Sequence, residues 1–174
     1  NYSVRDQLKR WQRTGMIRGI GISYKESTTY DIDLLCEELH SVVIHYIAGI
    51  HRPEDILASY RTWALVLGFK AIGRAQLTSD DEKNLTRLQR AMPRIAHRGL
   101  VAFDNLALEQ LNVRDHVDPI VWNTGFMGKD GQYTMFIDAT TETYAPSSCD
   151  LRCKSKGQNI RELFAHVRRG DWGQ

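Results

Sequence analysis

The chain has 174 residues, of which 42% are hydrophobic and 25% are charged, so it has the size and composition of one globular domain. Its formal net charge of +2 is too small to indicate a nucleic-acid or membrane partner from composition alone. Because no apolar run approaches the roughly 18 residues of a membrane-spanning helix, we expect a cytoplasmic protein without a membrane partner.

Predicted helices and apolar strands alternate over the first two thirds of the chain. The first helix covers residues 3–14, with Ser3 as its N-cap. Val4, Leu8 and Trp11 share one face of this helix. The elements that follow are a strand at 16–24, a helix at 30–40, a strand at 42–49, a helix at 53–62, a strand at 63–69, a helix at 79–95 and a strand at 99–105.

Two of these helices begin with recognisable start signals. Pro53 suits the first helical position because it has no N–H to satisfy, and Glu54 and Asp55 suit the positive end of the helix dipole. In the next helix along the chain, Ser79 precedes Glu82 by three positions, which predicts a capping box.

The predicted strands are apolar runs without strict polar alternation. Strands of this kind are buried on both faces, as the parallel sheet of an α/β protein requires. Residues 1–113 are therefore predicted to hold about four parallel strands with helices. These units form either a piece of a (β/α) barrel or a small open sheet.

The pattern changes after residue 113. A strand at 133–138 follows the turn signal Asp130-Gly131, and it is predicted to pair antiparallel with residues 142–146 as a small β-hairpin.

A C-terminal helix is predicted at residues 159–170, because Asn159 and Glu162 have the spacing of a capping box ahead of an apolar face. Residues 114–174 would then be a hairpin plus C-terminal helix extension within a single domain that spans residues 1–174.

Ligands of parallel α/β folds bind at the carboxyl ends of the strands, where loops converge and helix N-termini point. This rule selects the candidate site residues. They are Tyr24, Lys25, Glu26, Ala48, Gly49, His51, Arg52, Lys70, Gly73, Arg74, Asp104 and Asn105.

The second strand has two readings at its end. Gly49 would allow a ligand or a neighbouring backbone to approach closely, or it would simply form the turn. His45, within the strand, would face inward below Gly49, or it would be a hydrogen-bonded core histidine.

The next two strand ends carry polar side chains. Lys70 and Arg74 flank Gly73, so they would hold a carboxylate or phosphate, or form a solvated pair in a loop. Asp104 and Asn105 would bind ligand hydroxyl groups or cap the helix that follows.

Cysteine and histidine spacings do not predict a metal site. Cys149 and Cys153 lie four positions apart without a third cysteine nearby, which favours two reduced loop thiols. With Cys36 the chain has three cysteines, an odd number that argues against a disulfide-stapled secreted module. The sequence contains no HExxH, Walker, GxSxG or GxGxxG motif.

Basic side chains gather in the first helix and in the C-terminal region. They would form the solvated faces of helices, or a nucleic-acid groove as a weaker alternative. The residues are Arg5, Lys9, Arg10, Arg13, Lys154, Lys156, Arg161, Arg168 and Arg169.

Several stretches together resemble a family: "HYIAGIHRPEDI", "LVLGFKAIGR", "VAFDNLALEQLNV", "GFMGKDGQYTMFIDATTETYAPSS" and "NIRELFAHVR". They are similar to the carboxyl-terminal part of radical S-adenosylmethionine (SAM) proteins of bacteria, phages and mobile elements. The resemblance covers roughly residues 40–169.

The resemblance implies the last four strands of a six-stranded partial (β/α) barrel that binds SAM and an unknown substrate for radical hydrogen abstraction. Asp104 and Asn105 would lie on the substrate side. The residues implied for cofactor binding are His45, Ala48, Gly49, Lys70, Gly73 and Arg74.

The chain departs from this family in its cysteines. The family holds a 4Fe-4S cluster through a CxxxCxxC loop after the first strand, whereas Lys156 stands where Cys149 and Cys153 would need a third cysteine. Either a cluster-bearing segment lies outside this chain, or the chain is a non-catalytic structural or binding subunit of viral or mobile-element origin. The start at Asn1 fits a fragment, and a protein partner or a preceding segment would complete the barrel.

Overall fold

The computed structural model describes residues 3–26, 29–58, 62–71, 76–126, 131–132, 134–147, 155–156 and 159–169. The chain divides into two compact units, Asn1–Val117 and Asp118–Gln174. In the described part of the chain, no helix combines the length and apolar character that crossing a bilayer requires.

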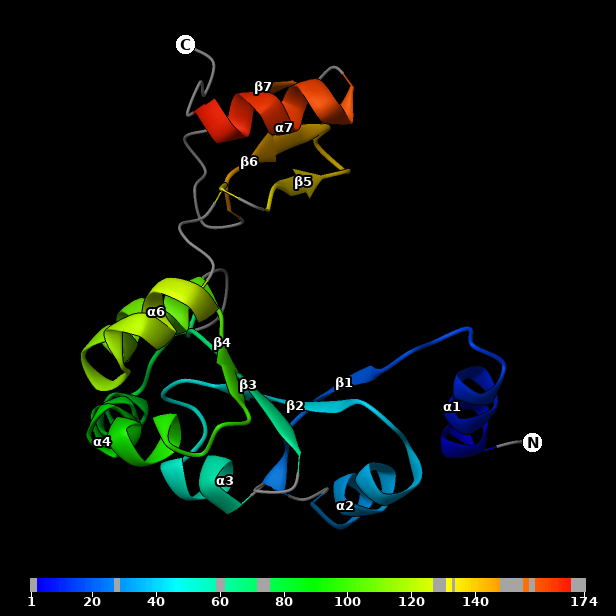
Figure 1. The fold of residues 1–174 in the computed structure, drawn as a ribbon, viewed down its shortest axis with the longest axis vertical. Helices are drawn as coiled ribbons and strands as arrows, with labels where there is room; N and C mark the ends of the chain where they lie inside the picture. Colours follow the sequence, from blue (N-terminus) through cyan, green and yellow to red (C-terminus); the bar gives the residue numbers. More distant parts are fainter. Residues whose placement is uncertain are drawn as a thin grey trace. The chain divides into compact units, whose positions relative to one another are not determined.

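The first unit is an α/β structure with a four-stranded parallel sheet (Figure 1). Its strands are hydrogen-bonded in the order β1-β2-β3-β4, and all three pairings are parallel. Its elements are α1 (Val4–Arg13), β1 (Ile20–Ser23), α2 (Thr29–Glu38), β2 (Val42–Ile47), α3 (Pro53–Ala58), β3 (Trp63–Leu67), α4 (Ser79–Ala96), β4 (Val101–Phe103), α5 (Asn105–Gln110) and η2 (Val113–His116). The predicted alternation of helices and parallel strands is confirmed.

The two faces of the sheet differ in burial. One face is buried, through Val42, Ile44, Tyr46, Ala64 and Val66. The other, which we call the open face, consists in register of Gly21, Ser23, Val43, His45, Ile47, Trp63, Leu65, Leu67 and Ala102. These side chains are half-buried or exposed, so burial on both faces, as predicted, is wrong for the described chain.

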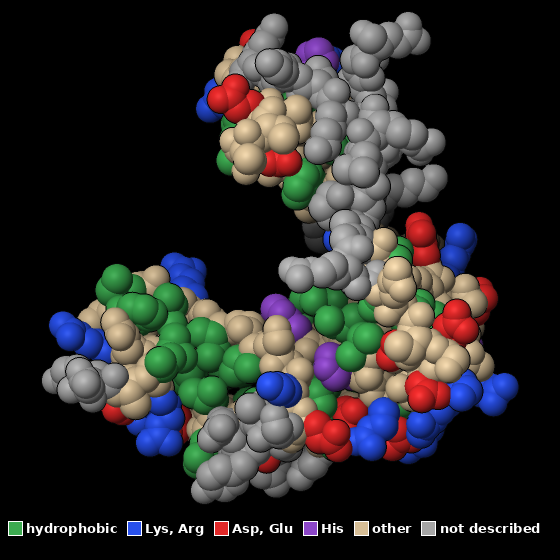
Figure 2. All heavy atoms as spheres, turned by 180° about the vertical axis from the view of Figure 1, so that it is seen from behind, with side chains coloured by type: hydrophobic (Ala, Val, Ile, Leu, Met, Phe, Trp, Pro, Cys, Tyr) green, Lys and Arg blue, Asp and Glu red, His purple; other side chains and the backbone are tan. Residues whose placement is uncertain are grey.

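Helix α1 is held against the end of α2 by polar contacts. Glu38 accepts Arg5 at 3.3 Å and Lys9 at 3.4 Å. The Gln12 side-chain amide exchanges two hydrogen bonds with the backbone of His40, of 2.7 and 2.9 Å. The apolar stripe of α1 stays outside the core, with Val4 78% exposed. Figure 2 shows hydrophobic side chains gathered on the surface beside α1.

Most predicted helix starts agree with the structure. Ser3 caps α1 by accepting the amide of Asp6, and α3 begins at Pro53. The capping box predicted at Ser79 is wrong by one position, because Thr78 is the N-cap and exchanges hydrogen bonds with Asp81. Thr78 is extended and its hydroxyl reaches the free amide at the helix start.

The second unit contains α6 (Pro119–Gly125), β5 (Phe136–Asp138), β6 (Thr143–Ala145), β7 (Ser155–Lys156) and α7 (Ile160–Arg169). The predicted hairpin is confirmed as the antiparallel pair β5–β6. The predicted cap is also confirmed, because Asn159 accepts the amide of Glu162 at 3.1 Å. Strand β7, which pairs with β6, was not predicted. The turn residue Asp130 lies outside the described residues.

Candidate functional site

The carboxyl ends of β2, β3 and β4 meet at one edge of the sheet, as predicted. The amide of Ala48 donates to Leu67 at 2.8 Å, and the amide of Asp104 donates to Val66 at 3.0 Å. The Asp104 carboxylate also accepts the amide of Gly68 at 2.8 Å. The candidate residues near positions 48, 70 and 104 therefore belong to neighbouring segments.

Gly49 lies against the first turn of α4. Its φ of 85° is in the left-handed region, which a side chain disfavours. A Cβ atom there would lie 3.2 Å from the carbonyl oxygen of Asp81 and 3.4 Å from a methyl group of Leu77. Of the two close approaches predicted for Gly49, the structure contains the one to a neighbouring backbone. Ala48 beside it is fully buried.

His45 belongs to the open face and not to the buried core. Its ring lies over Gly21, where a Cβ atom would come within 2.6 Å of both Cε1 and Nε2. The absence of a side chain at Gly21 in β1 therefore leaves room for the imidazole of β2. The half-buried ring contradicts the core reading, whereas the inward-facing position of His45 at a ligand site stays a prediction.

Asp104 caps α5. One carboxylate oxygen accepts the amide of Ala107 at 2.7 Å and that of Gly68 at 2.8 Å. Its side chain therefore joins the end of β3 to the start of α5, and the capping interpretation is confirmed for Asp104. Asn105 is the first residue of α5 and is half-buried.

The predicted cation pair after β3 is only partly described. Lys70 is exposed, whereas Gly73 and Arg74 lie outside the described residues. The backbone just before Lys70 is fixed, because the Gln110 side chain accepts the amide of Phe69 at 2.8 Å and donates to its carbonyl oxygen at 2.9 Å. The pairing of Lys70 with Arg74 at an anion stays a prediction.

A polar cluster joins the ends of β1 and β2 to the first turn of α3. Arg52 contacts Asp55 at 3.1 Å and Glu26 at 3.1 Å. Tyr24 donates to the Asp55 carboxylate, and Tyr46 donates to the Asp55 carbonyl oxygen, each at 3.3 Å. The roles of Asp55 and Tyr46 in this cluster were not predicted. The only sequence signal that involved Asp55 was the predicted helix start at Pro53.

His51 packs edge-on against the tyrosine rings of this cluster, at centroid distances of 5.3 Å from Tyr24 and 5.7 Å from Tyr46. Burial lowers its pKa, against the raising effects of a backbone hydrogen bond at Tyr24 and the charge of Asp55. Its Nδ1 accepts the amide of Ile47 at 2.7 Å, which requires the unprotonated nitrogen. Burial and the amide at Nδ1 both favour the neutral form of the ring.

The pKa of Asp55 is lowered in the same cluster. Burial alone would raise it, but hydrogen bonds from the side chain and backbone of Arg52 outweigh burial. The Asp55 carboxylate therefore stays ionised at neutral pH, which suits a structural anion more than a proton carrier.

The lowered pKa of His51 predicts a pH dependence of stability. Below the ordinary value of 6.5 the unfolded histidine takes up a proton that the folded one resists. The free energy of unfolding should therefore fall as the pH drops from 6.5 through the folded pKa. Urea denaturation at pH 7.5 and 5.5 should show a smaller decrease for His51→Gln than for the parent.

The exposed His97 provides the control for this measurement. His97→Gln should keep the full decrease in stability between the two pH values. An equal decrease in His51→Gln and the parent would contradict the assignment of this pH dependence to His51.

The described residues offer little for a metal centre. Within the described ranges, no three histidine, cysteine, aspartate or glutamate side chains converge as a metal site needs. Cys36 is half-buried, and burial raises the pKa of its thiol. Cys149 and Cys153 lie outside the described residues.

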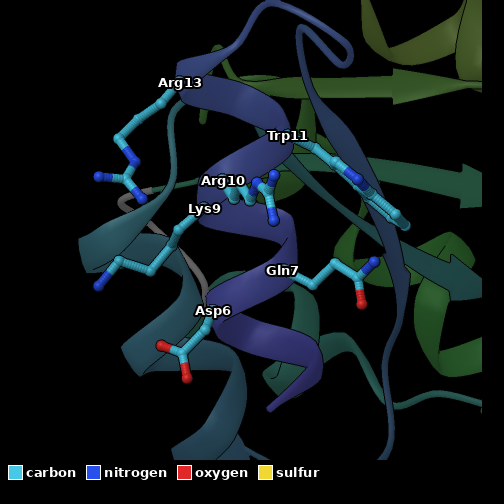
Figure 3. A pocket seen from close by; sticks show the side chains of 6 residues that line it. All are labelled: Asp6, Gln7, Lys9, Arg10, Trp11 and Arg13. Atoms are coloured by element: carbon cyan, nitrogen blue, oxygen red, sulfur yellow. The ribbon is translucent and has the colours of Figure 1, made fainter. Parts of the chain in front are cut away.

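A hollow of about 740 Å³ lies along α1, away from the strand ends (Figure 3). It was not predicted as a site, although its basic residues were noted in the sequence. Among the described residues, those that line it are Asp6, Gln7, Lys9, Arg10, Trp11 and Arg13.

No family model, curated protein or solved structure matches the chain.

Proposed function

We propose that residues 1–117 are the carboxyl-terminal part of a radical SAM-type (β/α) barrel, whose open face receives the adenosyl end of SAM. One observation carries this proposal: four parallel strands pair in consecutive order, and the described side chains on one face of their sheet are half-buried or exposed. In (β/α) barrels the helices form the outer layer, and ligands bind on the inner side near the carboxyl ends of the strands.

The open face has the chemistry that an adenosyl group requires. Leu65, Leu67 and Ile47 supply apolar surface on β2 and β3, and the ring of His45 lies over the neighbouring strand β1 at Gly21. Adenine binds to such surfaces by stacking and by apolar contact. Lys70, which follows β3, is one cation near this edge that would attract the carboxylate of the methionine end.

An iron–sulfur cluster does not fit the described residues. A cluster of the SAM-cleaving kind needs several closely placed thiolates, and Cys36 is the one cysteine among the residues that the structure describes. In this proposal the cluster is held by cysteines outside this chain. The present residues bind and orient the adenosyl group.

Titration with S-adenosylhomocysteine, a stable analogue, tests the adenosyl site. Calorimetry should detect saturable binding, and His45→Ala should weaken it about tenfold, which corresponds to about 1.4 kcal/mol. His97→Ala is the matched control, because His97 is exposed at the end of α4 that precedes β4. Absence of saturable binding, or equal effects of the two substitutions, would refute the proposal.

A second candidate is a non-catalytic binding or structural subunit of viral or mobile-element origin. It is favoured because two carboxylates at the strand ends already bind groups of the protein and not a ligand. Asp104 accepts two amides, and Asp55 is paired with Arg52. Folds often keep a scaffold under a different function. A monodisperse monomer in light scattering that also binds S-adenosylhomocysteine would contradict this candidate.

A further inference from the structure

Positive charge is concentrated in the first helical segment. Residues 3–18 contain five lysine and arginine side chains and a single acidic one, a formal charge of +4. The whole chain carries only +2, so the remaining residues are net negative. Such asymmetry within a nearly neutral chain indicates a local surface for an anionic partner.

The contacts of α1 divide its cations into two groups. Arg5 and Lys9 share the carboxylate of Glu38 at the end of α2. Arg10 and Arg13 are exposed, and the structure pairs neither with a carboxylate of the described residues. Their charge is therefore available to a partner while α1 stays docked.

An aromatic side chain projects from α1 on the far side of Arg10 from Arg13 (Figure 3). Trp11 is half-buried and lines the same hollow as Arg10 and Arg13. Figure 3 shows the indole projecting from one side of α1 and Arg13 from the other, with Arg10 between them. Among the described residues that line the hollow, Asp6 is the one acid. Its carboxylate accepts the Ser3 hydroxyl at 2.8 Å, and its backbone amide donates to the same hydroxyl oxygen at 3.2 Å.

We propose that a single-stranded nucleic acid binds across α1, from Arg13 over Arg10 to Trp11 (Figure 3). The arginines would neutralise phosphates, and the indole would stack on a base. Single strands are favoured over duplexes because a base must be free of its own stack to cover Trp11. An acidic protein segment could pair with the arginines, but its carboxylates would not stack on the indole. The proposal is independent of the adenosyl site.

Fluorescence anisotropy with a labelled oligothymidine of about twelve nucleotides tests this surface. The affinity should fall with salt, by a slope of about −0.7 for each phosphate neutralised. The double variant Arg10→Gln/Arg13→Gln should bind at least about tenfold more weakly and lose about 1.4 from that slope. Circular dichroism would verify that α1 remains folded.

The matched control is Arg90→Gln/Arg94→Gln on α4. It removes the same charge from two exposed arginines of the same unit, and it should keep the parent's affinity and most of its salt slope. Equal weakening by the two double variants would overturn the proposal, because general charge would then explain binding.

Substitution of the indole separates stacking from charge. Trp11→Phe should retain most of the affinity, whereas Trp11→Leu should weaken binding by about 5- to 100-fold. The proposal is overturned if the oligonucleotide does not bind at low salt. It is also overturned if polyglutamate or a duplex competes as well as the single strand. Binding of S-adenosylhomocysteine should be unchanged in all α1 variants, so failure of one site leaves the other testable.

Discussion

Gly68→Ala is expected to destabilise the first unit by about 3 kcal/mol, in the upper range for overpacking. Gly68 follows β3, and a Cβ atom there would lie 2.6 Å from Cβ of Leu106 and 2.7 Å from the backbone nitrogen of Ala107. Neither atom is the end of a flexible side chain, so α5 itself would have to move. Urea denaturation followed by circular dichroism measures the loss.

Gly99→Ala separates this steric effect from the general cost of replacing glycine. Gly99 has a φ of 79° with no atom within 4 Å of the added Cβ, so its cost is backbone strain alone, about 1–2 kcal/mol. Gly68 has an ordinary φ and should lose more. If Gly68→Ala were the milder change, the close approach of β3 and α5 would be refuted.

The parallel sheet could be predicted because its signals are local. Apolar runs alternating with amphipathic helices fix the order of the elements, and Pro53 and Asn159 mark helix starts through their own chemistry. Thr78 shows the limit of such signals. Two neighbouring residues, Thr78 and Ser79, both suit an N-cap, and only the backbone conformation decides between them.

Contacts between distant segments were not predictable from one sequence. Tyr24 and Asp55 are 31 positions apart, and they meet because parallel pairing brings the ends of β1 and β2 together. The two-residue strand β7 has no periodicity to recognise, and only its pairing with β6 defines it.

Burial of the sheet departs from the prediction for a physical reason. The apolar runs of β2 and β3 are compatible with burial on both faces. The structure buries Ile44 and Val66 on one face of the sheet but leaves Trp63 53% exposed and Ile47 36% exposed on the open face. An apolar run indicates that both faces of a strand can be buried. It does not indicate whether the same chain supplies side chains that cover both faces.

Substitutions of Asp104 distinguish a role in stability from a role in ligand binding at the strand ends. Asp104→Ala should cost about 2–4 kcal/mol of unfolding free energy. It removes an N-cap and leaves the amides of Gly68 and Ala107 without their acceptor. Thermal or urea denaturation would measure this loss.

Asp104→Asn is the matched variant, because its amide oxygen can accept both bonds without the charge. It should recover most of the stability, to within about 1 kcal/mol of the parent. Binding of S-adenosylhomocysteine should then be unchanged, since the side chain is occupied by the protein's own backbone. A stable Asp104→Asn variant with lost binding would instead assign the carboxylate to a ligand and overturn its purely structural role.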